Sequence, residues 1–206
     1  RRLLDDALAS RTCLTPQMAA SILVAVGEAL AECHSAQLCH GDLKPDNVLR
    51  HGSAWVLVDL GSCSAFGAPL RDRRDCLALQ DFAAEHCTLT YRAPELWQPS
   101  IGDRRDGAAD VFALGALCWA LAFGYSPFES ELRARGPVIV ESSHSRALSA
   151  PAPPPRSSIC LRRYPGFYSP LIEVARRLFV AEPSSRPDAR DALGLVRGLA
   201  AGGEAV

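Results

Sequence analysis

One loop and the aspartate that follows it contain the residues whose types and spacing could do chemistry. The loop, residues 40–49, carries Asp42, Lys44 and Asn47, and Asp59 comes directly after a short apolar run. Phosphoryl transfer needs a group that accepts the proton of the attacking hydroxyl, a cation beside the migrating phosphate, and oxygen ligands for Mg²⁺. Asp42 could be the proton acceptor, Lys44 the cation, and Asn47 and Asp59 the metal ligands. Each residue alone would be an ordinary turn residue, so it is their combination that favours catalysis.

Lys44 is the only lysine in the chain, and arginine fills the other basic positions. An ammonium is a compact point charge that can lie against a phosphoryl oxygen, whereas the wider guanidinium would not fit the same space. A single lysine has to fall somewhere, but its position inside this loop favours a functional role.

A predicted β-hairpin positions these side chains. Its strands cover residues 48–49 and 55–58 and are joined through residues 51–53. Asn47 directly precedes the first strand, and Asp59 directly follows the second. The hairpin could therefore bring Asp59 and the loop carboxylate of Asp42 to one metal-phosphate group.

A helix is predicted before the loop. Thr15 followed by Pro16 is a capping hydroxyl with a proline at the first helical position, and the helix is expected to end near His34. Its apolar residues recur at helical spacing and indicate a face in the core: Met18, Ile22, Val26, Leu30 and Cys33.

The remaining elements form the body that would hold the hairpin. Helices are predicted at residues 3–10, 77–84, 110–123, 169–181 and 187–200. The apolar run 111–124 is about four residues short of the roughly 18 that suggest a membrane span, so it indicates a buried helix. Residues 137–165, with a proline-rich stretch at 149–158, are predicted to be a Pro/Ser-rich surface connection, with a proline-recognition ligand as the alternative.

Composition excludes several classes of protein. The chain has 206 residues, 48% of them hydrophobic, which is enough for a packed core. The formal charge of −1 with interspersed signs disfavours binding to nucleic acid. The eight cysteines contain no C-x-x-C pair, which indicates reduced thiols in a cytoplasmic protein, with structural zinc as the alternative.

The motifs and their order resemble the C-terminal lobe of eukaryotic protein kinases. They are the loop at 40–47, Asp-Leu-Gly at 59–61, Ala-Pro-Glu at 93–95, Asp110 and Arg186. The resemblance implies an α+β, protein kinase-like fold in which residues 1–206 are the mostly helical C-terminal lobe with a short β-hairpin. It implies a serine/threonine protein kinase that transfers the γ-phosphate of ATP to a protein hydroxyl, with Mg²⁺ or alternatively Mn²⁺.

The resemblance also implies a role for each site residue. Lys44 would contact the γ-phosphate, and Leu49 would form part of the floor beneath the adenine. Asn47 and Asp59 would bind the metal and, through it, the nucleotide. Thr88 would bridge the catalytic aspartate and lysine.

Three further residues would be structural. Glu95 and Arg186 are expected to form the buried ion pair that anchors the end of the activation segment. Asp110 is expected to accept backbone N–H groups of the catalytic loop, which would explain a charge at the start of an apolar helix.

A closer similarity is to the Numb-associated kinase family. It is carried by residues 59–62, 79–84 and 87–96. Members have an extra helix in the activation segment, here expected at residues 77–86. They are membrane-associated through N-terminal lipidation, so membrane association is expected only through residues upstream of this chain.

The chain departs from the family pattern in two places. Gly41 replaces the usual arginine that pairs with a phosphorylated activation loop, so we predict activity that does not depend on phosphate at Ser62, Ser64 or Thr90. Leu60 replaces the usual phenylalanine and is expected to pack on His40.

Two other functions stay open at the level of sequence. No Gly-rich loop, β3 lysine or partner glutamate precedes Arg1, so the N-terminal lobe is expected to be absent from this chain and the fragment alone inactive. The chain could then be an inactive, kinase-like scaffold, although a scaffold has no need of Asp42, Lys44, Asn47 and Asp59 together. The His-Gly-Asp loop also resembles small-molecule phosphotransferases of the aminoglycoside and choline kinase type, which the motifs at 93–95, 110 and 186 disfavour.

Overall fold

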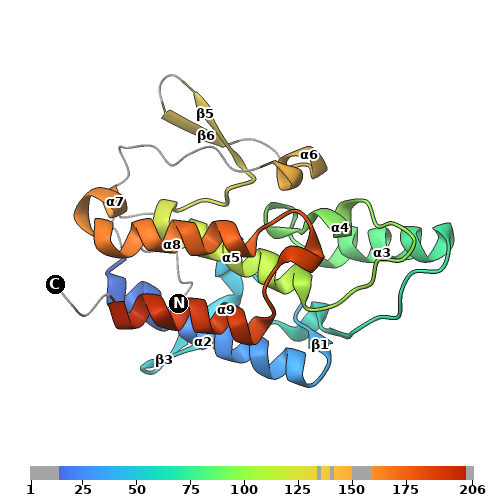
Figure 1. The fold of residues 1–206 in the computed structure, drawn as a ribbon, viewed down its shortest axis with the longest axis horizontal. Helices are drawn as coiled ribbons and strands as arrows, with labels where there is room; N and C mark the ends of the chain where they lie inside the picture. Colours follow the sequence, from blue (N-terminus) through green and yellow to red (C-terminus); the bar gives the residue numbers. More distant parts are fainter. Residues whose placement is uncertain (1–13, 134–135, 140–141, 150–158, 203–206) are drawn as a thin grey trace.

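The computed structural model describes residues 14–133, 136–139, 142–149 and 159–202. The body of the fold consists of helices α2 (Pro16–Ser35), α5 (Ala108–Phe123), α8 (Pro165–Leu178) and α9 (Ala189–Gly202). Helix α2 packs against α9, and α5 packs against α8 (Figure 1). This arrangement makes a mostly helical core that supports the loop and hairpin predicted to do chemistry.

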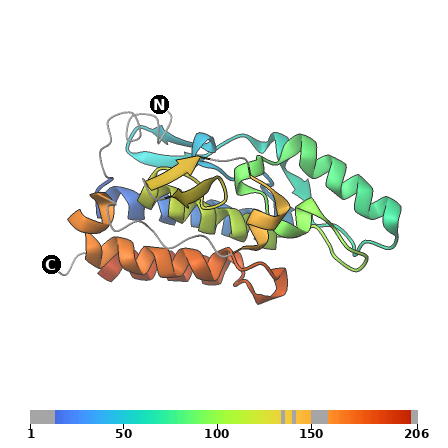
Figure 2. The same ribbon diagram turned by 90° about the horizontal axis from the view of Figure 1, so that it is seen from above.

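The six described strands pair as three antiparallel two-stranded sheets. β1 (Leu38–Cys39) pairs with β4 (Ser64–Ala65), β2 (Val48–His51) with β3 (Ala54–Leu57), and β5 (Ser130–Arg133) with β6 (Gly136–Ile139). The predicted hairpin is thus present, with Val48 opposite Leu57, and β3 packs on α2 (Figure 2).

Short helices and turns complete the described structure. From the loop at residues 40–49 to helix α5, the chain also forms η1 (Pro45–Asn47), η2 (Leu60–Ser62), α3 (Arg73–His86), η3 (Leu89–Tyr91) and α4 (Pro94–Trp97). Further along lie α6 (His144–Leu148), α7 (Ile159–Arg163) and η4 (Pro183–Ser185). Helix α3 agrees with the predicted helix at residues 77–86 and begins four residues earlier, because Asp72 caps it by accepting from the backbone N–H groups of Arg74 and Asp75.

Helix α2 begins where the sequence predicts. The Thr15 hydroxyl accepts a hydrogen bond from the Met18 backbone N–H, and Pro16 occupies the first position. Ile22, Val26 and Leu30 are buried, whereas Met18 is 36% exposed, so the predicted core face covers only the middle of the helix. By length and composition α2 could cross a membrane, but here its apolar face packs against α9 and β3 as a core helix does.

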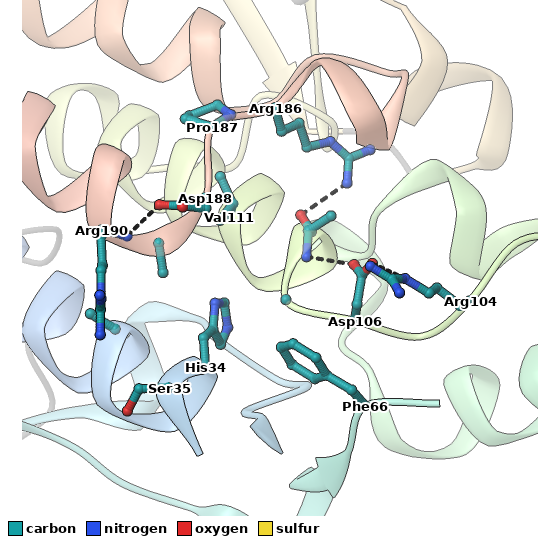
Figure 3. A pocket seen from close by; sticks show the side chains of 14 residues that line it. His34, Ser35, Phe66, Arg104, Asp106, Val111, Arg186, Pro187, Asp188 and Arg190 are labelled. Carbon is teal, nitrogen blue, oxygen red and sulfur yellow. Dashed lines mark hydrogen bonds and ion pairs between the residues drawn. The ribbon is translucent and has the colours of Figure 1, made fainter. Parts of the chain in front are cut away.

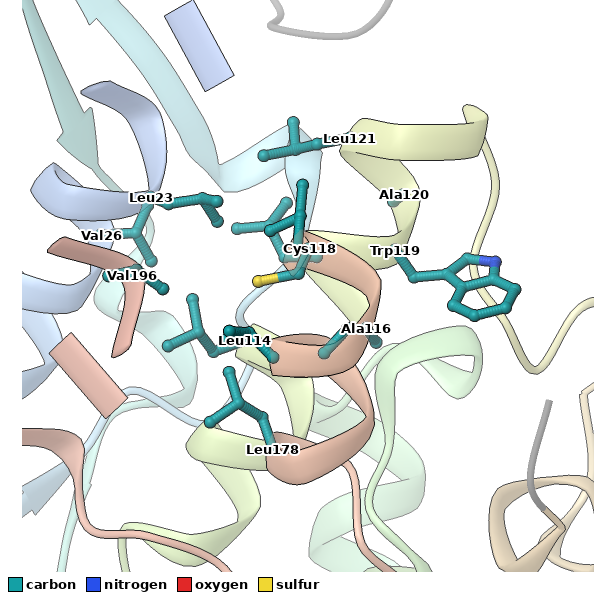
Figure 4. Packing of buried hydrophobic residues seen from close by; sticks show 14 of the residues in the cluster. Leu23, Val26, Leu114, Ala116, Cys118, Trp119, Ala120, Leu121, Leu178 and Val196 are labelled. Atoms are coloured by element: carbon teal, nitrogen blue, oxygen red, sulfur yellow. The ribbon is translucent and has the colours of Figure 1, made fainter. Parts of the chain in front are cut away.

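Helix α5 is the centre of the core, and its residues from Asp110 to Ala122 are buried. Side chains from α2, α8 and α9 meet those of α5, among them Leu23, Leu178 and Val196 (Figure 4). Gly115 lets α8 approach closely, because a Cβ at that position would lie 2.9 Å from the Ala175 carbonyl oxygen. The helix ends at Gly124, which adopts a left-handed conformation with φ 83°.

Some predicted boundaries differ from the structure, and parts of the predictions fall outside the described residues. Helix α8 starts at Pro165 and includes Pro170, because the buried face from Leu171 to Leu178 outweighs the lost backbone hydrogen bond. The described parts of 137–165, predicted to be a surface connection, contain β6, α6 and α7, and residues 150–158 lie outside the described residues. The predicted helix at residues 3–10 also lies outside them.

Candidate active site

Two side chains of the loop at residues 40–49 form a closed cluster with Thr88. The Lys44 ammonium donates to Asp42 Oδ2 at 2.6 Å and to the Thr88 hydroxyl at 2.8 Å. The Thr88 backbone N–H donates to Asp42 Oδ1 at 2.9 Å. The structure therefore joins Thr88 to the loop across 46 residues of sequence, in the bridging position that the resemblance implies.

Asn47 is oriented by the same aspartate. Its Nδ2 donates to the Asp42 carbonyl oxygen at 2.8 Å and to Asp42 Oδ2 at 3.2 Å. Both bonds use the amide nitrogen, so the amide oxygen is the atom left to coordinate a cation. Asn47 is 5% exposed, and its turn, η1, leads straight into β2.

Asp59 lies at the same end of the hairpin as Asn47. The Val58 backbone N–H donates to the Asn47 carbonyl oxygen at 2.8 Å, which fixes the two chain segments side by side. Asp59 itself is exposed and left-handed, with φ 68°, and its Oδ1 accepts from the Gly61 N–H at 3.2 Å. Its carboxylate makes no hydrogen bond to Asp42 or Lys44, so the structure links Asp59 to the cluster only through the backbone bond between Val58 and Asn47.

The Asp110 carboxylate binds two backbone N–H groups at the start of the loop. Its Oδ2 accepts from the His40 N–H at 2.8 Å, and its Oδ1 accepts from the Gly41 N–H at 2.8 Å. The carboxylate is buried, and these bonds compensate for its desolvation, as the resemblance implies. A third contact was not predicted: His34 Nε2 lies 2.9 Å from Asp110 Oδ2. The sequence offers no local signal for this contact, since 76 residues separate the pair.

His40 is fully buried and fixes the start of the loop. Its Nδ1 accepts from the Asp42 N–H at 3.3 Å, so its Nε2 carries the proton and donates to the Val58 carbonyl oxygen at 3.1 Å. The prediction that Leu60 packs on this ring is wrong. Leu60 is 63% exposed, whereas Ser62 of the same turn, η2, is buried and His40 is fully buried.

Glu95 and Arg186 form the predicted buried ion pair. Arg186 Nη1 donates to Glu95 Oε1 at 2.6 Å and Nη2 to Oε2 at 2.9 Å. The Arg186 side chain is 0% exposed, and its guanidinium also lies 5.0 Å from the centre of the Phe112 ring. The pair ties the segment that follows Thr88 to the helical body.

The buried Cys87 and the half-buried Tyr91, both beside the cluster, have shifted pKa values. Burial raises the pKa of the Cys87 thiol to about 11, so this neighbour of Thr88 stays protonated at neutral pH. Burial also raises the pKa of the Tyr91 hydroxyl well above its usual range. Both groups are therefore neutral beside the Asp42 and Lys44 charges.

Asp42 is buried, and a small cavity lies beside it. The cavity that touches Asp42 and Thr88 has a volume of about 20 Å³, which is room for one water molecule. A cavity of about 400 Å³ lies elsewhere, between the end of α2, residues 104–108 and the start of α9, and His34 and Phe66 project into it (Figure 3). Leu49, predicted to lie beneath an adenine, is half-buried in β2 opposite Val56.

The chain is similar in sequence to known protein kinases. A family model described as protein kinase domain matches residues 1–195. Serine/threonine-protein kinase 16 of Mus musculus is 30% identical over 175 residues, which cover 84% of this chain and 53% of the mouse protein. Serine/threonine-protein kinase ppk13 of Schizosaccharomyces pombe is 32% identical over 156 residues, 75% of this chain and 42% of the yeast protein. The chain thus spans about half the length of the curated relatives it matches.

Proposed function

Because this chain belongs to the protein kinase family, we propose that it transfers the γ-phosphate of ATP to serine or threonine hydroxyls of a protein substrate. The observation that carries the proposal is the cluster of Asp42, Lys44 and Thr88. The Asp42 carboxylate and the Lys44 ammonium lie 2.6 Å apart, and the Thr88 hydroxyl accepts a second bond from the ammonium. A carboxylate and a cation are the groups that a hydroxyl nucleophile and a migrating phosphate need.

Asp42 orients the substrate hydroxyl and accepts its proton. Its carboxylate already accepts from Lys44 Nζ and from the Thr88 N–H, so it is held in one orientation before a substrate arrives. Lys44 places a positive charge beside the phosphate, and Thr88 fixes the direction of the ammonium.

The oxygen donors fit a hard divalent cation. The donors that this end of the hairpin offers are the Asn47 amide oxygen and the Asp59 carboxylate. Mg²⁺ is commonly held by one or two protein oxygens, with phosphates and water completing its shell. When bound with ATP, the cation neutralises charge on the phosphates. Asn47 and Asp59 would hold it, and Mn²⁺ suits the same donors.

Similarity to serine/threonine-protein kinase 16 and to ppk13 supports serine or threonine as the acceptor. We also propose membership of the Numb-associated group, on helix α3 at residues 73–86, and a cytoplasmic location, on the free thiols among the described cysteines. We propose that any association with membranes is made by residues outside this chain.

The test is a kinase assay on the full gene product with Mg²⁺, ATP and a panel of protein substrates. We expect Asp42→Ala to lower kcat by roughly 10²–10⁴-fold, the range for loss of a positioned general base. Asp191→Ala, an exposed aspartate on α9, is the matched control and should leave kcat unchanged. Phosphate transfer to choline or an aminoglycoside but not to protein would favour the small-molecule reaction. No transfer that depends on Asp42 would favour the scaffold.

A further inference from the structure

The space beside Gly41 is occupied by an arginine from another part of the chain. Gly41 has φ +84°, and a Cβ at this position would lie 2.6 Å from the Ser62 carbonyl oxygen and 2.7 Å from Arg105 Nη2. Any side chain here would therefore collide with both groups. A side chain at position 41 would need the space that the Arg105 guanidinium fills, so the two cannot be present together.

Arg105 contacts three segments from this position. Its Nη2 donates to the Ser62 carbonyl oxygen at 2.8 Å, three residues after Asp59. Its guanidinium carbon lies 4.0 Å from the centre of the Phe82 ring on α3, a cation–π contact. Its backbone carbonyl accepts from the Gly67 N–H at 2.8 Å. The half-buried Arg105 side chain thus joins the beginning of the segment 59–88 to helix α3, which lies near the end of that segment.

Ser62 completes the connection. Ser62 is 8% exposed, and its hydroxyl donates to the His86 carbonyl oxygen at 2.8 Å. The His86 ring lies 4.4 Å from the Phe82 ring that Arg105 covers. His86 is two residues before Thr88, which binds the Asp42 and Lys44 side chains. Hydrogen bonds therefore connect Arg105 to Ser62 and Ser62 to His86, and the chain leads from His86 to Thr88, which contacts Asp42 and Lys44.

We propose that Arg105 is a positioning residue that orders the activation segment, residues 59–95, without a phosphate. In this role a guanidinium from the loop before α5 replaces the absent arginine of the catalytic loop, and it acts on backbone and aromatic groups rather than on a phosphorylated residue. The proposal rests on the proposed kinase function for its effect on catalysis, but its structural part does not depend on that function.

The structural part is tested by hydrogen exchange in the full gene product after phosphatase treatment. Arg105→Ala removes a hydrogen bond from a charged donor, so we expect exchange of the amides in residues 60–67 to accelerate about 10- to 100-fold. Arg104→Ala is the matched control, because its guanidinium is 60% exposed and bonds to Asp106 instead of Ser62. Arg105→Lys keeps the charge but loses the planar stacking on Phe82, and it should give an intermediate rate.

The catalytic part is tested with the same variants. We expect Arg105→Ala to lower kcat at least about tenfold with little change in the KM for ATP, Arg105→Lys to recover part of that loss, and Arg104→Ala to match the parent. Removal of phosphate from the parent should leave kcat unchanged.

Each result decides between supporting and overturning the proposal. Equal exchange of residues 60–67 in Arg105→Ala and Arg104→Ala would overturn it, as would uniform acceleration across the whole chain, which marks a general loss of stability. A parent enzyme that phosphatase inactivates would overturn it too. If the parent shows no Asp42-dependent transfer while the exchange result holds, the proposed function fails and the ordering role of Arg105 stands.

Discussion

Replacing Arg186 with alanine should remove a large part of the stability of this domain. The guanidinium is fully buried and makes five hydrogen bonds, two to Glu95 and one each to the carbonyl oxygens of Ala108, Val180 and Ala181. The variant would leave the Glu95 carboxylate, whose side chain is 11% exposed, without its counter-charge. Breaking one side of a buried ion pair costs about 3–5 kcal/mol.

That loss is large compared with the whole stability of a typical domain, about 5–15 kcal/mol. For a chain of this size it corresponds to a fall in Tm of roughly 6–20 °C. Equilibrium denaturation with urea, followed by circular dichroism, measures the free energy of unfolding directly.

A surface pair provides the control. Arg197 Nη2 lies 2.6 Å from Glu28 Oε1, a contact as short as the buried one, but the two side chains are 56% and 52% exposed. Arg197→Ala should therefore cost no more than about 1 kcal/mol. If Arg186→Ala came within about 1 kcal/mol of Arg197→Ala, the buried pair would not anchor the fold as argued.

A double variant separates the charge from the packing. Arg186→Met with Glu95→Gln removes both charges and keeps most of the volume, so it should be more stable than Arg186→Ala. A double variant as unstable as the single one would assign the loss to the three carbonyl bonds instead of the ion pair.

Two further predictions concern the core. Gly115→Ala should lower the free energy of unfolding by about 1–3 kcal/mol, because its Cβ would lie 2.9 Å from atoms of α8. Gly198→Ala, at an exposed position on α9 with no atom within 4 Å of the added Cβ, should raise it by up to about 1 kcal/mol. Equal shifts of the two variants in thermal melts would contradict the close packing at Gly115. Burial raises the pKa of Cys87 from 9.0 to about 11, so above pH 9 the unfolded state loses its thiol proton first, and stability should fall as pH rises from 9 to 11 by up to about 1.4 kcal/mol per pH unit. Cys87→Ala should reduce that slope in denaturation curves measured at several pH values, and an unchanged slope would show that this thiol does not contribute.

The local parts of the fold could be predicted because their causes are local. Thr15 and Pro16 start α2, the apolar run that becomes α5 is a buried helix, and the hairpin joins Asn47 to Asp59. Such features depend on caps, periodicity and turns within a few residues of one another. The bridging position of Thr88 and the Glu95–Arg186 pair were also predicted, but from resemblance to a family and not from spacing.

The sequence by itself therefore determined the residue types of the cluster, the helices and the hairpin that carry them. Only the tertiary structure decided that His34 contacts Asp110 and that Arg105 lies beside Gly41, because 76 residues separate the first pair and Arg105 reaches Ser62 across 43 residues. It also decided that Leu60 is exposed and does not pack on the buried His40. Contacts of this kind arise when separate helices pack against one another, and no periodicity along the chain encodes which side chains meet there.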